Sequence, residues 1–524
     1  MRDHLPTGPN PPAPARAEVL AALSLAIDLG LGLPVEHVLR ASLVSKALAA
    51  QLGGDESEQA TAFYTTMFLW VGCVADSHEY SRWFGDDIAV RAASYEVDWT
   101  GVPYAVFLLR SLGYGRPLPQ RLKVAGSLLS NPRGNLTAMI TSHCSSAALF
   151  ASRLGFGDDV CGALPFGFER WDGQGLPTGA SGEQLPLAMR ITQVADIAEV
   201  LHHRHGLDGC IATVRERRGG WFDPEVAETF AENAEALLAL PDDVWQLAVA
   251  QAPGAQQAVT EAQLDELVMA LGDFVDLKSP YTLGHSRAVA ALVGAAARHA
   301  GLTRAEQATL RRAGHLHDIG RIGVSNLVWD KPDRLTATER ERMQLHPFLS
   351  GRILARVPAL AAEARLVVNH HERLDGSGYP NRLSGSDLSL SDQLLAAADR
   401  LQGLVESRPH RAALSPGEAA DLLRQDARAG HLHSGAVDAV LTAAGRTSAR
   451  GAWPAGLTDR EVDVLRLVAA ATPTREIATR LGITEKTVRN HIDHVFAKTG
   501  TSNRVGLSLF ALTTGLAAIT STPA

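Results

Sequence analysis

A long internal repeat is the feature that most limits how this chain of 524 residues can fold. The paired segments are residues 36–77 with 284–325, at an offset of 248, and residues 168–177 with 371–380, at an offset of 203. In the first pair Gly53 coincides with Gly301 and Gly72 with Gly320, and Glu58-Gln-Ala-Thr61 coincides with Glu306-Gln-Ala-Thr309 without a gap. Chance similarity between two alanine-rich helical segments does not account for this register. Because repeats correspond to repeated structural units, we predict two tandem domains of one fold, the first with an insertion of 45 residues near 78–142.

The second copy carries seven side chains of the kinds that bind divalent metals. They are His285, His317, Asp318, His346, His370, His371 and Asp399. Imidazole and carboxylate together suit iron, manganese or zinc. One ion does not need seven ligands, whereas two ions that share a carboxylate would use them all. Paired metals are a device for hydrolysing phosphate esters.

The first copy has lost most of this set. Leu69-Trp70 stands where the second copy has His317-Asp318, and Gly167-Phe168 stands in place of the histidine doublet. The positions that survive are His37, His143 and Asp196. Three scattered ligands without the shared aspartate cannot hold a metal pair. We expect these to be hydrogen-bonded core residues of a structural or sensory domain.

Helical patterns account for nearly all of the second copy. Apolar residues recur at helical spacing over 261–278, and capping boxes at Thr303–Glu306 and Thr338–Glu341 predict helix starts. A helix over 391–405 would carry Asp399. Residues 375–380 concentrate turn-forming residues and predict a loop. Because no long strand is predicted, the fold class is all-α.

Residues 265–445 resemble the HD-GYP subfamily of HD phosphohydrolases. The matching residues are Tyr281–His285, His317–Gly323, Lys331-Pro332, His346-Pro347, His370–Pro380, Asp399 and Arg408–Arg411. The resemblance implies hydrolysis of cyclic di-GMP, or a related phosphate ester, by two divalent ions, iron or manganese more than zinc. It implies that the seven residues bind metal, with Asp318 bridging and Asp318 and Arg321 at the catalytic centre. The loop of Gly376, Gly378, Tyr379 and Pro380 would shape the substrate entrance.

Three positions depart from the family pattern. Arg321 replaces a lysine, and the guanidinium is not a neutral exchange for an ammonium group. Tyr281 stands where trimetal members carry a carboxylate, which favours two metals. The segment 397–402 lacks a second acidic residue often found after the metal-binding aspartate.

The C-terminal segment predicts a helix-turn-helix. A capping box at Thr458–Glu461 opens one helix, 474–481 forms a second, and Thr484 caps a third over 485–499. The segment resembles the LuxR/FixJ-type DNA-binding domain, which implies double-stranded DNA as a partner and a homodimer. The residues implied at the DNA are Lys486, Thr487, Arg489, Asn490, Lys498 and Arg504.

The whole-chain properties predict a cytoplasmic protein without membrane contact. The net charge is −8, so nucleic-acid binding must come from a local patch. The four cysteines form no Cys-x-x-Cys pair, which suits a reducing compartment. Residues 1–16 predict a disordered tail without a signal peptide, and 506–522 predicts a packing helix too polar to span a membrane.

The predicted domains are a tail (1–16), a degenerate HD-type domain (17–245), an HD-GYP-type domain (255–447), a linker (448–456) and a helix-turn-helix domain (457–524). This organisation predicts a metal-dependent cyclic di-GMP phosphodiesterase coupled to a transcriptional regulator. The alternative is a transcription factor whose HD-GYP-like domain senses a nucleotide without turnover. The intact ligand set favours the enzyme, whereas Arg321 and the degenerate first copy favour the sensor.

Overall fold

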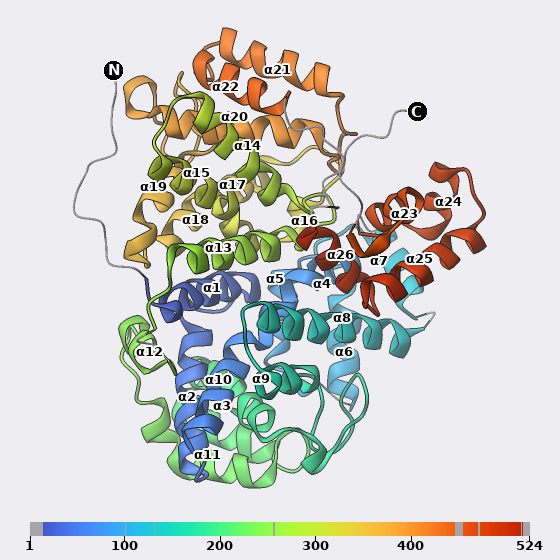
Figure 1. Ribbon diagram of the computed structural model, residues 1–524. Helices are drawn as coiled ribbons and strands as arrows, with labels where there is room; N and C mark the ends of the chain where they lie inside the picture. Colours follow the sequence, from blue (N-terminus) through green and yellow to red (C-terminus); the bar gives the residue numbers. More distant parts are fainter. Residues whose placement is uncertain are drawn as a thin grey trace. The chain divides into compact units, whose positions relative to one another are not determined.

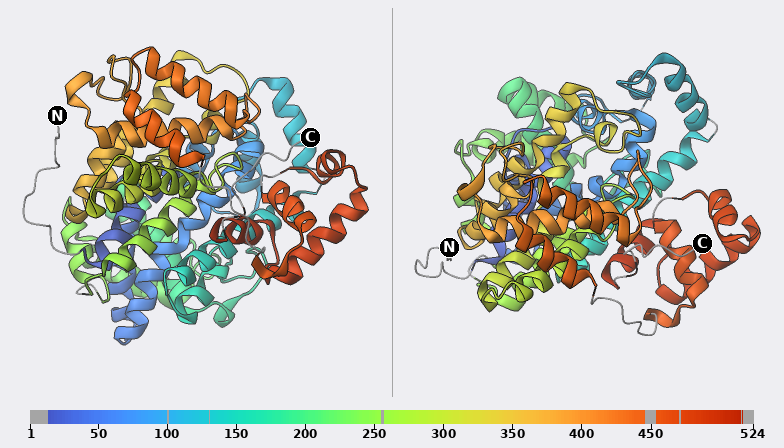
Figure 2. Two further views of the ribbon diagram at one scale, coloured as in Figure 1. Left: turned by 45° about the horizontal axis from the view of Figure 1, so that its top comes forward. Right: turned by 90° about the horizontal axis from the view of Figure 1, so that it is seen from above.

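The computed structural model describes residues 14–99, 101–129, 131–254, 257–445, 454–469, 472–514 and 516. Within these ranges helices are the only regular secondary-structure elements, and β-pairing is limited to isolated bridges (Figure 1 and Figure 2). The predicted all-α fold is therefore confirmed. The predicted tail, the linker and the end of the last helix lie largely outside the described residues. No helix in the described part of the chain is both long enough and apolar enough to cross a membrane.

The chain separates into two compact units, one of residues 15–258 with 325–327 and one of the remaining residues. The helices of the first unit are α1 (Arg16–Leu31), α2 (His37–Gln51), α3 (Glu56–Phe68), α4 (Gly72–Phe84), α5 (Asp87–Ser94), α6 (Gly101–Ser111), α7 (Leu118–Leu129), α8 (Pro132–Arg153), α9 (Asp158–Ala163), α10 (Leu187–Glu216), α11 (Pro224–Leu238) and α12 (Trp245–Gln251). Helices α2, α3 and α10 pack together around buried apolar side chains such as Phe63 and Leu39. Helices α5, α6 and α7 belong to the predicted insertion.

The second copy of the repeat contains α13 (Glu261–Asp276), α14 (His285–His299), α15 (Arg304–Leu316), α16 (Asn326–Trp329), α17 (Ala337–Gln344), α18 (His346–Leu354), α19 (Ala361–Asn369), α20 (Leu390–Val405), α21 (Pro416–Arg428) and α22 (Ser434–Ala444). Helix α14 is central and packs against α15, α20 and α22. The capping box at Thr303 is present, as predicted. The one predicted at Thr338 is wrong, because Thr336 caps α17 with Glu339. Both threonines precede a glutamate by three residues, so sequence spacing alone did not separate them.

One pair of glycines shared by the two copies, Gly320 and Gly72, marks a close approach within each copy. A Cβ on Gly320 would lie 2.2 Å from the carbonyl oxygen of His346, and one on Gly72 would lie 2.3 Å from that of His143. These distances are far below van der Waals contact, so only glycine lets α18 pack against the turn at Gly320 and α8 pack against the chain at Gly72. This glycine is therefore a packing requirement of one fold used twice.

The C-terminal helices are α23 (Asp459–Ala469), α24 (Thr474–Leu481), α25 (Glu485–Thr499) and α26 (Arg504–Thr513). Gly482 ends α24 in the left-handed conformation, with φ of 63°, and Thr484 caps α25 by accepting from the Thr487 amide. A glycine suits this turn because it has no Cβ to oppose a positive φ. The helix-turn-helix arrangement predicted from the sequence is present.

Candidate metal centre

The structure brings all seven predicted metal ligands of the second copy together. His285 opens α14, His317-Asp318 follow α15, His346 opens α18, His370-His371 follow α19, and Asp399 lies within α20. Five of the seven are buried, and only His371 and Asp399 are partly exposed. Ligands far apart in sequence therefore meet because the ends of packed helices meet.

A tight turn after α15 positions the pair His317-Asp318. The chain passes from α15 into a 3-10 segment, Ile319–Gly323. The Ser350 hydroxyl of α18 donates to the carbonyl of His317 and accepts from the Gly320 amide, both at 2.8 Å. These two hydrogen bonds fix the turn against α18, which also carries His346.

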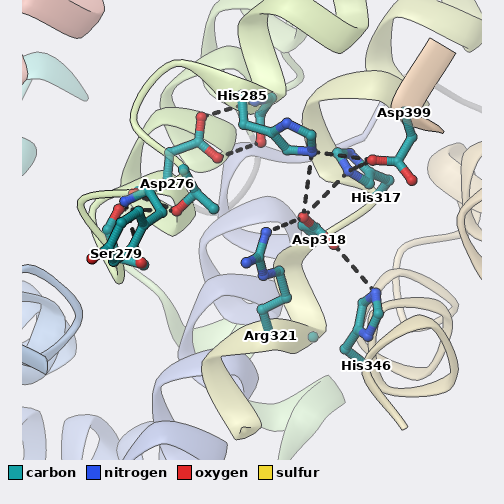
Figure 3. A network of polar contacts seen from close by, with 12 residues as sticks. Asp276, Ser279, His285, His317, Asp318, Arg321, His346 and Asp399 are labelled. Atoms are coloured by element: carbon teal, nitrogen blue, oxygen red, sulfur yellow. Dashed lines mark hydrogen bonds and ion pairs between the residues drawn. The ribbon is translucent and has the colours of Figure 1, made fainter. Parts of the chain in front are cut away.

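Asp318 lies between His285 and His317 on one side and His346 on the other (Figure 3). Its Oδ2 is 3.3 Å from Nε2 of His317 and 3.8 Å from Nε2 of His285. Its Oδ1 is 3.4 Å from Nε2 of His346 and 3.9 Å from Nε2 of His370. Each oxygen of one carboxylate thus faces a different pair of imidazoles, which is the arrangement that a metal-bridging carboxylate requires.

Asp399 and His371 complete the two groups. Oδ1 of Asp399 is 3.2 Å from Nε2 of His285 and 3.8 Å from Nε2 of His317. His371 lies with His346 and His370, and the three offer nitrogens within 4.8 Å of one another. One group therefore consists of His285, His317 and Asp399, and the other of His346, His370 and His371.

Hydrogen bonds to the backbone set the tautomers of three histidines. Nδ1 of His317, His346 and His370 donates to a carbonyl three residues earlier, at 2.9, 2.6 and 2.5 Å. Each Nε2 then carries a lone pair that points into the site. In the described structure Nε2 of His317 has no hydrogen-bond partner, and those of His346 and His370 face each other at 3.3 Å. Converging lone pairs without donors fit divalent cations.

Burial keeps two of these imidazoles neutral. Loss of hydration lowers the pKa of His370 to about 3, with His317 and His346 adding to the effect. Burial also lowers the pKa of His346 to about 4, against the attraction of Asp318. Because a metal binds the deprotonated ring, these two histidines need to lose no proton at neutral pH.

A wide basic cavity opens onto this cluster. Its volume is about 1010 Å³, and His285, Asp318, His346, His371 and Asp399 line it. Eight of the lining residues are arginine or lysine, against four aspartates. The basic residues are Arg321, Lys331, Arg334, Arg340, Arg373, Arg400, Arg408 and Arg411. The cavity therefore suits a large ligand with more than one negative charge.

The loop at the cavity mouth is held by a buried carboxylate. Glu372 is fully buried and accepts from the amides of Asn381 at 2.6 Å and Leu383 at 3.0 Å. In the first copy Glu169 accepts from the Thr178 and Gly179 amides in the same way. The glutamate persists where the metal ligands are lost, so it holds the loop in place. Sequence analysis did not assign it this role.

The comparisons with known proteins agree with this geometry. The HD domain family matches residues 270–434, and the luxR family of bacterial regulatory proteins matches residues 455–511. The chain is 31% identical over 416 residues to 3'3'-cGAMP-specific phosphodiesterase 3 of Vibrio cholerae, covering 78% of this chain and 90% of that protein. This chain belongs to the HD-GYP family of phosphohydrolases.

A second relative and a solved structure support the assignment. The cyclic di-GMP phosphodiesterase of Thermotoga maritima is 34% identical over 148 residues, which are 28% of this chain and 39% of that protein. The crystal structure of a cyclic GMP-AMP-specific phosphodiesterase of Vibrio cholerae superposes with a TM-score of 0.57 at 26% identity, covering 83% of this chain and 99% of that one. HD-GYP phosphohydrolases bind divalent metals, and the two side-chain groups described above are the candidate sites.

Arg321, which replaces the lysine usual in the HD-GYP family, is held on two sides. Its Nη1 donates to Oδ2 of Asp318 at 2.5 Å, and its guanidinium lies 3.8 Å from the centre of the Trp329 ring. A planar guanidinium can form the ion pair and stack on the indole at once. The substitution therefore preserves a positive charge beside the shared aspartate.

Glu406 is a site residue that the sequence analysis missed. Its carboxylate accepts from Nδ1 of His285 at 2.9 Å, and Gln402 and Arg408 donate to it at 2.7 and 3.0 Å. It follows Asp399 by seven residues, about two helical turns, and it stands directly after Val405, the last residue of α20. That spacing is the sequence signal that would have revealed it.

Replacing Glu406 with glutamine is expected to weaken Mn²⁺ binding by about 10–100-fold, because carboxylates that orient a metal-binding histidine contribute that much. The amide oxygen of the variant can still accept from Nδ1 of His285. Without the negative charge it favours less strongly the tautomer whose Nε2 lone pair points inward. Titration with Mn²⁺, followed by calorimetry, measures the change. Glu341→Gln, on the exposed surface of α17, is the matched control and should bind as the unaltered protein does. Equal affinity in both variants would contradict the orienting role.

The six residues predicted to contact DNA fall into two classes. Lys486, Arg489 and Asn490 are exposed on α25. Of these, Arg489 also donates to Glu485 at 3.4 Å. The other three make contacts within the module: Thr487 Oγ1 lies 2.8 Å from that of Thr484, Lys498 donates to Glu461 at 2.7 Å, and Arg504 donates to the Val468 and Thr472 carbonyls. A role at DNA stays a prediction for all six.

Proposed function

We propose that this HD-GYP protein hydrolyses a cyclic dinucleotide by means of two divalent ions, one in each side-chain group. The observation that carries the proposal is the placement of Asp318, with one carboxylate oxygen toward each group. When bound, the ions would supply Lewis acidity and a nucleophilic water at neutral pH. His285, His317 and Asp399 would hold one ion, and His346, His370 and His371 the other. Iron and manganese suit these ligands.

The cavity supports the substrate class. A volume of about 1010 Å³ lies at the upper end of the range for small-molecule sites. The excess of arginine and lysine over aspartate in its lining complements two phosphate groups. Tyr379 and His371, with ring centres 4.9 Å apart, offer aromatic surface near the metal ligands for a base. The relatives act on 3'3'-cGAMP or cyclic di-GMP by name, so the class common to them is the cyclic dinucleotide.

Within the site we expect separate roles for Asp318, for Arg321 and for the loop at the cavity mouth. Asp318 would share its carboxylate between the ions, and Arg321 would add positive charge where the transition state gains negative charge. The loop of Gly376, Gly378, Tyr379 and Pro380 would close over the nucleotide, held by Glu372. The cavity lining includes Asp318, Arg321, Gly378 and Tyr379 but not Gly376 or Pro380, which supports these roles for the first four.

The test is to load the protein with Mn²⁺ and incubate it separately with cyclic di-GMP and 3'3'-cGAMP, resolving the products by chromatography. Linear dinucleotide or mononucleotide from either compound is expected, and the faster substrate identifies the preference. Saturable binding of either compound without product would leave only the sensor alternative. Hydrolysis that survives His370→Ala unchanged would show that the activity comes from elsewhere.

We further propose that α25 binds double-stranded DNA and that the module links the enzyme to transcription, in the cytoplasm and as a homodimer. The exposed Lys486 and Arg489 provide positive charge on one helix, which suits the major groove and its phosphates. The match to the luxR family over residues 455–511 supports this assignment.

Each of the substitutions Lys486→Ala and Arg489→Ala is expected to lower the slope of log affinity against log salt by about 1, because each phosphate contact releases about one counterion. Fluorescence anisotropy of a labelled duplex at several salt concentrations measures the slope. Arg428→Ala removes the same charge from the exposed end of α21 and should leave the slope unchanged. An identical slope in all three variants would contradict the DNA-binding role of α25.

A further inference from the structure

The first copy has kept a cavity at the position where the second copy has its metal centre. Trp70, His143 and Phe168 line it, and by the repeat these residues occupy the positions of Asp318, His346 and His371. The change of residues has replaced carboxylate and imidazole with aromatic rings. The site has thus changed its chemistry while remaining hollow.

The insertion of the first copy supplies much of the cavity wall. Lining residues from this segment are Tyr80, Phe84, Arg91, Ser94, Tyr95, Trp99, Tyr104, Phe107, Leu108, Leu136, Met139 and Ile140. They come from α4, α5, α6 and α8 and from the chain between α5 and α6. The exposed Gln174 also lines the cavity, so the space reaches the surface. The second copy has no counterpart of this segment, so the wall is specific to the first.

The aromatic side chains that line the cavity pack against one another in stacked and perpendicular pairs. Trp99 stacks on Phe168 with ring centres 5.4 Å apart and an angle of 20° between the planes. Trp70 stands perpendicular to Phe168, at 5.7 Å and 90°. Tyr95 lies 5.7 Å from Trp70. Aromatic rings prefer such offset-stacked and edge-to-face partners, so another ring is the natural occupant.

The histidine and the two arginines that line this cavity are already paired. Nδ1 of His143 bonds Asp76 and its Nε2 bonds the Leu69 carbonyl, both at 3.0 Å. Both ring nitrogens therefore face acceptors, which leaves no lone pair for a metal. Arg91 is paired with the same Asp76, and Arg170 with Asp98. Because Arg91 and Arg170 are both paired with carboxylates, neither is available to bind a phosphate group. This disfavours a nucleotide as the ligand.

The volume leads to the same conclusion. This cavity measures about 120 Å³, against about 1010 Å³ at the metal centre. A dinucleotide does not fit such a space. Benzene occupies an apolar cavity of about 150 Å³, so this slightly smaller cavity has the size of a single ring. A second fused ring would have to extend toward the opening at Gln174.

We propose that the cavity of the first copy is a binding site for a small, uncharged aromatic molecule. The metal centre of the second copy plays no part in this binding. The first copy is then a ligand-binding domain with its own specificity.

The test is calorimetric titration of the full chain with indole as the probe. One saturable site per chain is expected, with the same affinity after metal is removed with a chelator. Cyclohexanemethanol, a neutral saturated ring compound, should bind more weakly, because it cannot stack. Excess cyclic di-GMP should not displace indole. Absence of saturable binding, or displacement by the dinucleotide, would overturn the proposal.

Two variants of neighbouring residues on α6 locate the site. Leu108 lines the cavity, whereas Leu109 is 55% exposed. Leu108→Trp should fill the space and weaken indole binding by at least about 10-fold, as expected when a packed space is overfilled. Leu109→Trp should bind indole as the unaltered chain does. Should Leu108→Trp fail to fold, Met139→Trp from α8 tests the same space. Unchanged affinity in a folded, cavity-filling variant would refute the assignment.

Discussion

The variant Asp318→Asn is expected to lose cyclic dinucleotide hydrolysis by well over 100-fold, since even residues that only orient metal ligands are worth about 10–100-fold. An amide has one oxygen acceptor, and its NH₂ group would face one of the two imidazole pairs that Oδ1 and Oδ2 face now. The variant should therefore hold at most one ion firmly. Elemental analysis of the Mn²⁺-loaded protein and initial rates measure the two losses together.

The interpretation needs a check on folding, because Asp318 also pairs with the buried Arg321. Removing one partner of a buried ion pair leaves an uncompensated charge. The double variant Asp318→Asn/Arg321→Gln removes that charge, and it should recover thermal stability without recovering activity. Asp421→Asn, at a carboxylate whose side chain is 79% exposed, is the control for the isosteric change. Two bound ions and near-normal rates in Asp318→Asn would contradict the bridging role.

Gly378→Ala is expected to lower kcat/KM by about 100-fold, because a displacement of about 1 Å at a substrate-positioning group can cost that much. A Cβ at this position would lie 2.4 Å from the Arg373 amide nitrogen and 2.5 Å from the Cα of Glu372. Both are backbone atoms beside the candidate metal ligand His371, so the loop must shift. The strain should also cost about 1–3 kcal/mol of unfolding free energy. Steady-state kinetics and thermal melting measure the two effects.

Two other glycines provide matched comparisons. A Cβ on Gly417 would meet no atom within 4 Å, so Gly417→Ala should change neither activity nor stability. Gly175 is the counterpart of Gly378 in the first copy, and a Cβ added there would lie 2.4 Å from the Cα of Glu169. Gly175→Ala should therefore destabilise the protein while leaving kcat/KM in place. Full activity in Gly378→Ala would show that the loop does not position the substrate.

Local sequence patterns predicted much of the fold. The helix over 485–499 was predicted at its observed bounds, because caps and apolar spacing act within a few residues of the chain. Thr336 and Thr338 both have the spacing of a capping box, and the prediction from the sequence was Thr338, whereas Thr336 caps the helix. Packing around the helix start decides such cases.

Residues whose roles depend on distant partners were beyond the sequence. Glu406 looked like one more charged residue at a helix end until His285 was found 2.9 Å away. Glu372 lies beside the histidine doublet yet binds loop amides nine and eleven residues later. The inward contacts of Arg504 likewise follow from the way α23 and α26 pack.

The sequence by itself determined the duplicated all-α architecture, the family, the seven ligand types and the helix-turn-helix, because these are written in local spacing and in the internal repeat. Only the tertiary structure decided that one aspartate faces two imidazole groups, that a buried glutamate holds the loop, and that the degenerate copy encloses an aromatic cavity. The physical reason is that helix packing sets which side chains meet, and packing depends on surfaces formed by residues far apart in the chain.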